Sequence, residues 1–113
     1  MSKRIAVVIS EDPILTGRPV EALRIALGLY AGDHEISVIL LGRAPLLLMK
    51  DTGEIVDVDI LEKYLPSFKQ LSIPFIVELG TAMGAASDDF FITTRTADEI
   101  RQFVRTAERS LIF

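Results

Sequence analysis

The chain has 113 residues and a mass of 12.5 kDa, which is room for one domain. Half of its residues are hydrophobic and 25% are charged, so the composition excludes a disordered chain, and the formal net charge of -4 gives no electrostatic reason to expect binding to nucleic acid. With no cysteine and one histidine, the sequence excludes disulfides, thiolate nucleophiles, cysteine-ligated zinc, iron–sulfur clusters and His-rich metal sites.

The apolar stretches of the sequence are short. None approaches the ~20 consecutive apolar residues that a bilayer requires. The basic start, residues 1–4, leads directly into a strand-like segment rather than into a cleavable apolar region. We therefore expect a cytoplasmic protein with no membrane association and no bound cofactor or metal.

The first half of the chain alternates between strand-like and helix-like patterns. Residues 5–9 and 36–41 are continuous apolar runs without polar alternation, which is typical of strands covered on both faces of a parallel sheet. Between them, apolar residues at helical spacing predict a helix over residues 19–31, with a narrow polar stripe. A short apolar segment, residues 44–49, follows the second strand.

The second half continues the alternation. A helix begins near Asp57 or Asp59 and extends to Leu71, and we expect Pro66 to kink it or to make it restart. A third strand over residues 73–79 follows. After a loop of about ten residues come a fourth strand (90–92), a helix that starts with a capping box from Thr96 to Glu99, and a fifth strand (111–113).

This order of elements predicts the fold class. Strands that alternate with helices form α/β domains with right-handed crossovers. We expect a single domain over residues 1–113, with a three-layer α/β/α architecture and a five-stranded, mostly parallel sheet.

The element order and the string YLPSFKQL (residues 64–71) together resemble the DsrE/DsrF/DsrH-like family, which includes the TusB, TusC and TusD sulfur-relay subunits. The resemblance covers essentially the whole chain and rests on packing residues, so it bears on fold before function. In catalytic members of that family a cysteine near the end of the third strand carries a persulfide. The corresponding residues here, 77–84, contain no cysteine, so the resemblance implies a non-catalytic paralogue.

Candidate binding residues lie where the strands are expected to end. Ligands of open parallel sheets bind outside the carboxyl ends of the strands, where glycine turns and arginines could hold a small anion. Plain turns are the favoured alternative at these positions. The candidate ligand-binding residues are Ser10, Arg18, Arg43, Glu78, Gly80 and Thr81. If this edge forms a pocket, Glu78 is expected to be partly desolvated; otherwise its side chain faces solvent.

An excess of apolar residues predicts a subunit interface. The segment Leu46, Leu47, Leu48 and Met49 carries four large apolar side chains, and it looks too short to bury all of them inward. We expect these residues to contact a second subunit, although core packing could also absorb them. On the last helix Arg101, Arg105 and Arg109 recur one turn apart; a solvated face is favoured there over an acidic partner.

These patterns favour a non-catalytic DsrE-like subunit that acts as an assembly or binding module. It would form a homo-oligomer, or a hetero-oligomer with a paralogous, cysteine-bearing sulfurtransferase subunit. The alternative is a small-molecule or anion-binding enzyme that uses the strand-end residues, with Glu78 as the base. The sequence itself predicts no catalytic residue for the first hypothesis.

Overall fold

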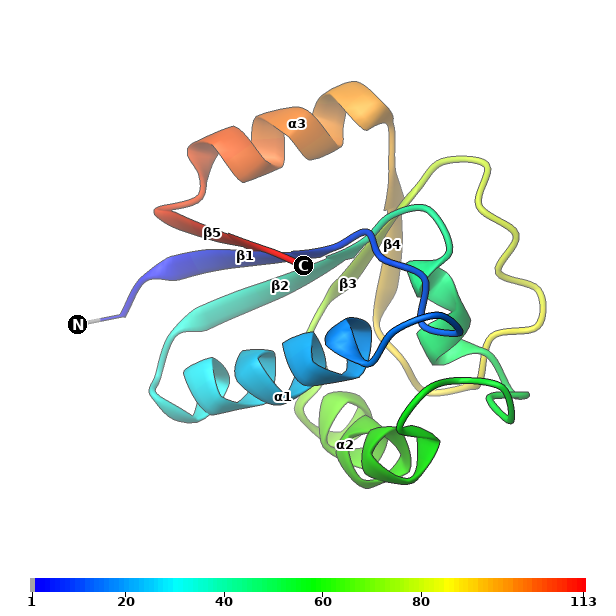
Figure 1. The fold of residues 1–113 in the computed structure, drawn as a ribbon. Helices are drawn as coiled ribbons and strands as arrows, with labels where there is room; N and C mark the ends of the chain where they lie inside the picture. Colours follow the sequence, from blue (N-terminus) through cyan, green and yellow to red (C-terminus); the bar gives the residue numbers. More distant parts are fainter. Residues whose placement is uncertain (1) are drawn as a thin grey trace.

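The computed structural model describes residues 2–113, which form a five-stranded parallel sheet between two helical layers (Figure 1). The strand order is β4-β3-β2-β1-β5, and every neighbouring pair is parallel. Helices α1 and α2 cover one face of the sheet and α3 lies on the other (Figure 1). The predicted three-layer α/β/α architecture is confirmed, and the sheet is parallel throughout.

The elements follow the predicted order along the chain. Their bounds are β1 (Arg4–Ile9), α1 (Arg18–Ala31), β2 (Glu35–Leu40), the 3-10 helix η1 (Ala44–Leu48), α2 (Val58–Leu71), β3 (Phe75–Glu78), β4 (Ile92–Arg95), α3 (Ala97–Thr106) and β5 (Arg109–Ile112). The predicted capping box at the start of α3 is present, with Thr96 and Glu99 each accepting a hydrogen bond from the other's backbone N–H.

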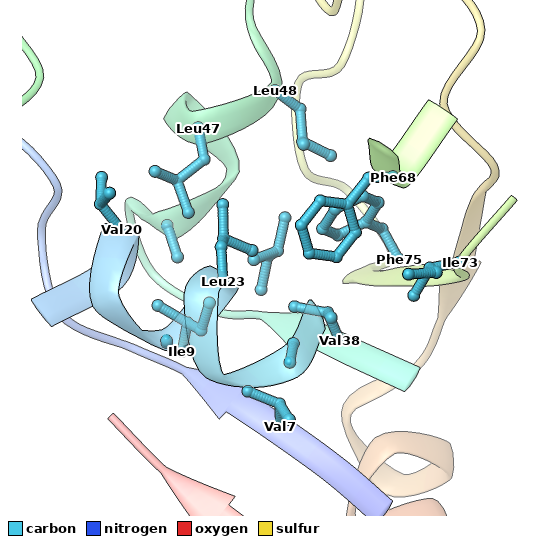
Figure 2. Close-up of a cluster of buried hydrophobic side chains, with 14 of the residues drawn as sticks. Val7, Ile9, Val20, Leu23, Val38, Leu47, Leu48, Phe68, Ile73 and Phe75 are labelled. Carbon is cyan, nitrogen blue, oxygen red and sulfur yellow. The ribbon is translucent and has the colours of Figure 1, made fainter. Parts of the chain in front are cut away.

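The central strands lack polar alternation because both of their faces are buried. Alternate β1 residues point to opposite sides: Val7 and Ile9 join the core beneath α1 and α2, whereas Ala6 and Val8 join the core beneath α3. The first core is the larger of the two, and Figure 2 shows its side chains interdigitating between the sheet and the helices.

Two strand predictions were displaced from the observed strands. The fourth strand was predicted at residues 90–92, but β4 pairs with β3 from Ile92 to Arg95. Phe90 lies outside the strand and packs its ring edge-on against Phe75, with ring centroids 5.7 Å apart. Its apolar character therefore reflects loop packing on the core. β5 likewise begins at Arg109, so the prediction that Arg109 lies on the last helix is wrong.

The prediction of a restart at Pro66 is also wrong, because α2 continues as an α-helix through this residue. Proline removes the hydrogen bond that would reach the carbonyl of Glu62, four residues earlier. Pro66 and Glu62 are both exposed, so water can satisfy that carbonyl. The buried side chains of Leu61 and Phe68 on either side of Pro66 anchor the helix to the core.

The string that carries the family resemblance serves packing. The Phe68 ring lies 5.2 Å from that of Phe75. Lys69 donates a hydrogen bond from Nζ to Ser87 Oγ at 2.9 Å, and its ammonium lies 4.7 Å from the centre of the Phe90 ring. These contacts tie the end of α2 to the loop between β3 and β4.

Residues 46–49 are not all buried, as expected, but the prediction that they contact a second subunit is wrong for two of the four. Leu47 and Leu48 are fully buried in the larger core (Figure 2), whereas Leu46 and Met49 are half-buried. The 3-10 helix turns both leucines inward, and an antiparallel bridge between Met49 and Ala86 holds its end against the β3–β4 loop. Leu47 and Leu48 are therefore core residues and not interface residues.

Candidate functional site

The carboxyl ends of β1 and β2 meet closely at one edge of the sheet, which we call the strand-end edge. The N–H of Leu41 donates to the carbonyl of Ile9 at 2.9 Å. Gly42 follows with a φ of +57°, and a Cβ at this position would lie 3.4 Å from the carbonyl oxygen of Ser10. The left-handed backbone favours glycine here, and a Cβ would only just be accommodated beside Ser10. Ser10 is thus held at the edge, where its hydroxyl donates to the carbonyl of Phe113.

Both arginines of the predicted anion site are paired with carboxylates. Arg18 Nε lies 3.1 Å from a Glu11 oxygen, and Arg43 lies 3.2 Å from Asp12 Oδ2. The guanidinium of Arg18 also lies 5.6 Å from the centre of the Phe113 ring. An incoming anion would therefore have to displace or share these carboxylates.

The turn after β3 is closed by its own hydrogen bonds. Gly80 adopts a φ of +96°, which lets the chain reverse after Glu78. Thr81 donates both its backbone N–H, at 3.0 Å, and its hydroxyl, at 2.7 Å, to the carbonyl of Glu78. These donors are occupied within the turn, so they form no cradle for an anion. The structure therefore shows a plain turn after β3, which is the alternative to the predicted anion site.

Glu78 ends β3 with an exposed side chain, opposite Arg95 in the register of β4. Neither Arg18 nor Arg43 pairs with it, because both contact other carboxylates. The structure therefore shows the solvent-facing alternative for Glu78 and not the partly desolvated one.

A shallow hollow of about 190 Å³ lies at the strand-end edge, and we call it the edge hollow. It brings together two of the predicted site residues, Arg43 and Thr81; the other four are not among the residues that line it. Its lining consists of Gly42, Arg43, Pro45, Leu46, Met49, Thr81 and Ala82. These side chains include no nucleophile activated by a base, so the edge hollow can hold a small group but offers no catalytic pair.

Exposed apolar side chains at the strand-end edge were missed in the sequence. Leu15, in the loop after β1, is 79% exposed, and Leu79, directly after β3, is 66% exposed. Together with the half-buried Leu46 and Met49 they form what we call the apolar rim. For Leu79 the available signal was its place directly after the charged Glu78, where the buried run of β3 has already ended.

The described part of the chain contains neither a candidate metal-binding cluster nor a candidate membrane-spanning helix. Across residues 2–113, no three His, Asp or Glu side chains gather closely enough to hold a metal ion. No helix within the same residues has the length and apolar character needed to cross a bilayer.

Comparison with known proteins supports the fold rather than a function. No family model matches the chain, and no curated protein matches it by sequence. Among solved structures, the crystal structure of the YchN protein from E. coli aligns over 100% of both chains with a TM-score of 0.75 and 19% sequence identity. The chain therefore shares the fold of YchN over its whole length, which supports the DsrE-like fold expected from the sequence.

Proposed function

We propose that this protein is a non-catalytic DsrE-like subunit that acts as an assembly or binding module, alone as a homo-oligomer or together with a cysteine-bearing sulfurtransferase paralogue. The observation that carries the proposal is the composition of the strand-end edge. Residues 77–84, where the resemblance implies a persulfide cysteine, contain no sulfur nucleophile. The nearby arginines are neutralised by carboxylates, and apolar side chains are exposed beside them.

The apolar rim supports association through this edge. Leu15 and Leu79 are large apolar side chains that expose most of their surface to water, and Leu46 and Met49 line the edge hollow. Covering such surface is favourable by about 25 cal/mol for each Å² removed from water. A second subunit on this edge would also cover the ion pairs of Arg18 and Arg43.

The test is the mass of the purified protein in solution. Light scattering at tens of micromolar should give at least twice 12.5 kDa, and Leu46→Glu or Leu15→Glu should lower that mass while circular dichroism stays unchanged. Leu71→Glu is the matched control, because Leu71 is 43% exposed on α2, outside the apolar rim, and the mass should not change.

Two results would contradict the proposal. A wild-type monomer that also co-purifies with no second polypeptide would leave no assembly to explain. A small molecule that co-purifies in stoichiometric amount at the edge hollow would favour the alternative, a binding protein or enzyme for small molecules.

A further inference from the structure

The face of the sheet beneath α3 is only partly covered. Helix α3 has ten residues and, within residues 2–113, is the one helix on that face (Figure 1). Five strands at about 4.8 Å spacing span nearly 20 Å, which exceeds the ~10 Å width of one helix. Sheet surface is therefore left open beside α3.

An apolar hollow of about 330 Å³ lies in this open area, and we call it the α3 hollow. It lies between α3 and the ends of β1, β2 and β5. The apolar residues that line it are Val8, Leu41, Ile100, Val104 and Ile112. Ile112 is 61% exposed, so the aliphatic parts of the neighbouring side chains do not cover it. Its apolar surface is therefore open to a ligand.

Two arginines complete the lining of the α3 hollow. Arg101 and Arg105 are four residues apart on α3, so they project from the same side of the helix. Arg101 pairs with Asp98 one turn earlier, and both side chains are exposed, so this pair is weak and can be exchanged. In the part of the chain that the structure describes, no carboxylate lies within ion-pair distance of Arg105, and none lines the hollow.

We propose that the α3 hollow binds an amphiphilic carboxylate, that is, a carboxylate attached to an aliphatic body of medium length. The aliphatic body would cover Ile112, Val8 and Leu41, and the carboxylate would accept hydrogen bonds from the guanidinium groups. Ligand sites typically combine a mainly apolar lining with a few polar groups that fix orientation, and arginine matches the geometry of a carboxylate. This site lies on the α3 face of the sheet and shares no lining residue with the edge hollow or the apolar rim.

Octanoate is a suitable probe, with binding followed by amide chemical shifts of the isotope-labelled protein. We expect saturable shifts concentrated in α3 and β5. Affinity should be at least about fivefold weaker for 1-octanol, which lacks the charge, and about tenfold weaker for octylammonium, which reverses it. Acetate, which lacks the aliphatic body, should not saturate.

Variants separate the charge from the apolar surface. Arg105→Gln should weaken octanoate binding about fivefold and leave octanol binding unchanged, because glutamine keeps most of the stem and removes the charge. Ile112→Thr should weaken the binding of both octanoate and octanol. Because Ile112 is largely exposed, this substitution should not disrupt the fold. The control is Arg24→Gln, on α1 at the opposite face of the sheet, where Arg24 pairs with Glu21 one turn away; octanoate binding should not change.

The proposal is overturned if octanoate fails to saturate, or if octanol binds as tightly as octanoate. It is also overturned if Arg105→Gln binds octanoate like the wild type, or if the shifts centre on residues outside α3 and β5. The mass measured for the assembly has no bearing on these outcomes, so the two proposals can fail separately.

Discussion

At the scale of single residues, the lack of cysteine determines which sulfur chemistry is open to this protein. The thiolate is the group that attacks and accepts sulfane sulfur, and the thioether of methionine has no ionisable proton. The chain contains three methionines and no cysteine. Any role beside a sulfurtransferase must therefore rest on contacts and not on covalent sulfur transfer.

We predict that the protein cannot be persulfidated. After incubation with a persulfide donor and denaturation, intact-mass measurement should show no species heavier by the mass of a sulfur atom. A Thr81→Cys variant, which places a thiol in the turn after β3, should gain that mass and show that the donor is active. A stable sulfur adduct on the wild-type chain would contradict the prediction.

Glu99 makes the start of α3 sensitive to pH. The backbone N–H of Thr96 donates a hydrogen bond to the Glu99 carboxylate and holds its pKa below the usual value of 4.5. A carboxyl group with a lower pKa in the folded state stabilises the fold fully above its unfolded pKa, and this contribution is lost as the pH falls through the folded pKa.

The expected result is a pH-dependent effect of Glu99→Gln on the free energy of unfolding. Urea unfolding should show a larger destabilisation at pH 7 than at pH 3, because the wild-type carboxylate is charged at pH 7 and becomes protonated in a growing fraction of molecules as the pH falls. Glu62→Gln removes an exposed carboxylate that caps no helix and serves as the matched control. Equal destabilisation by Glu99→Gln at the two pH values would contradict this account of the capping box.

At the scale of elements, η1 shows how an apolar surplus is divided between core and surface. Four consecutive large apolar residues gave no sign of which ones would be buried. In the structure Leu47 and Leu48 fill the larger core beside Leu23 and Phe68, as Figure 2 shows, and Leu46 contacts the edge hollow. α1 behaves similarly, since its wide apolar face packs against both the sheet and α2.

We predict that Leu47→Ala and Leu48→Ala each lower the free energy of unfolding by about 2–5 kcal/mol, because each leaves a cavity in a closely packed core. Leu71→Ala, at an exposed position of α2, should cost less than about 1 kcal/mol. Urea unfolding monitored by circular dichroism measures all three. A cost for Leu47→Ala as small as that for Leu71→Ala would place Leu47 outside the core.

At the scale of the whole molecule, the strand order divides the sheet into a protected centre and two open edges. β1 and β2 each have neighbours on both sides, and both of their faces are covered by side chains. β4 and β5 have four residues each, no buried residue and one strand neighbour. Short edge strands of this kind open locally more easily than the centre of the sheet.

Hydrogen exchange should follow this division. Amides of β1 and β2 should exchange with the free energy of global unfolding, whereas those of β4 and β5 should exchange faster, through local opening. Exchange measured at low protein concentration, where an assembly is dissociated, is the control for protection by a partner. Equal protection of edge and central strands at low concentration would contradict the prediction.

Local patterns in the sequence were sufficient to predict the order of the elements, the fold class and the residue at which α3 begins. Continuous apolar runs, helical spacing and the Thr96–Glu99 pair act over a few residues, so they can be recognised without knowing the rest of the chain. The ends of strands were less predictable. A parallel strand is defined by the partner it pairs with, and Phe90 is apolar for a reason other than strand pairing.

The lack of sulfur chemistry followed from the sequence by itself, because no fold can supply a thiol that the chain does not contain. Whether the candidate site is free to bind an anion could be decided only from the tertiary structure. Whether Arg18 and Arg43 are free to bind an anion depends on carboxylates at Glu11 and Asp12, and the pairing distances are set by how the loops meet at the strand-end edge. Burial of Leu47 likewise depends on the space that separate helices leave between them, which no local pattern records.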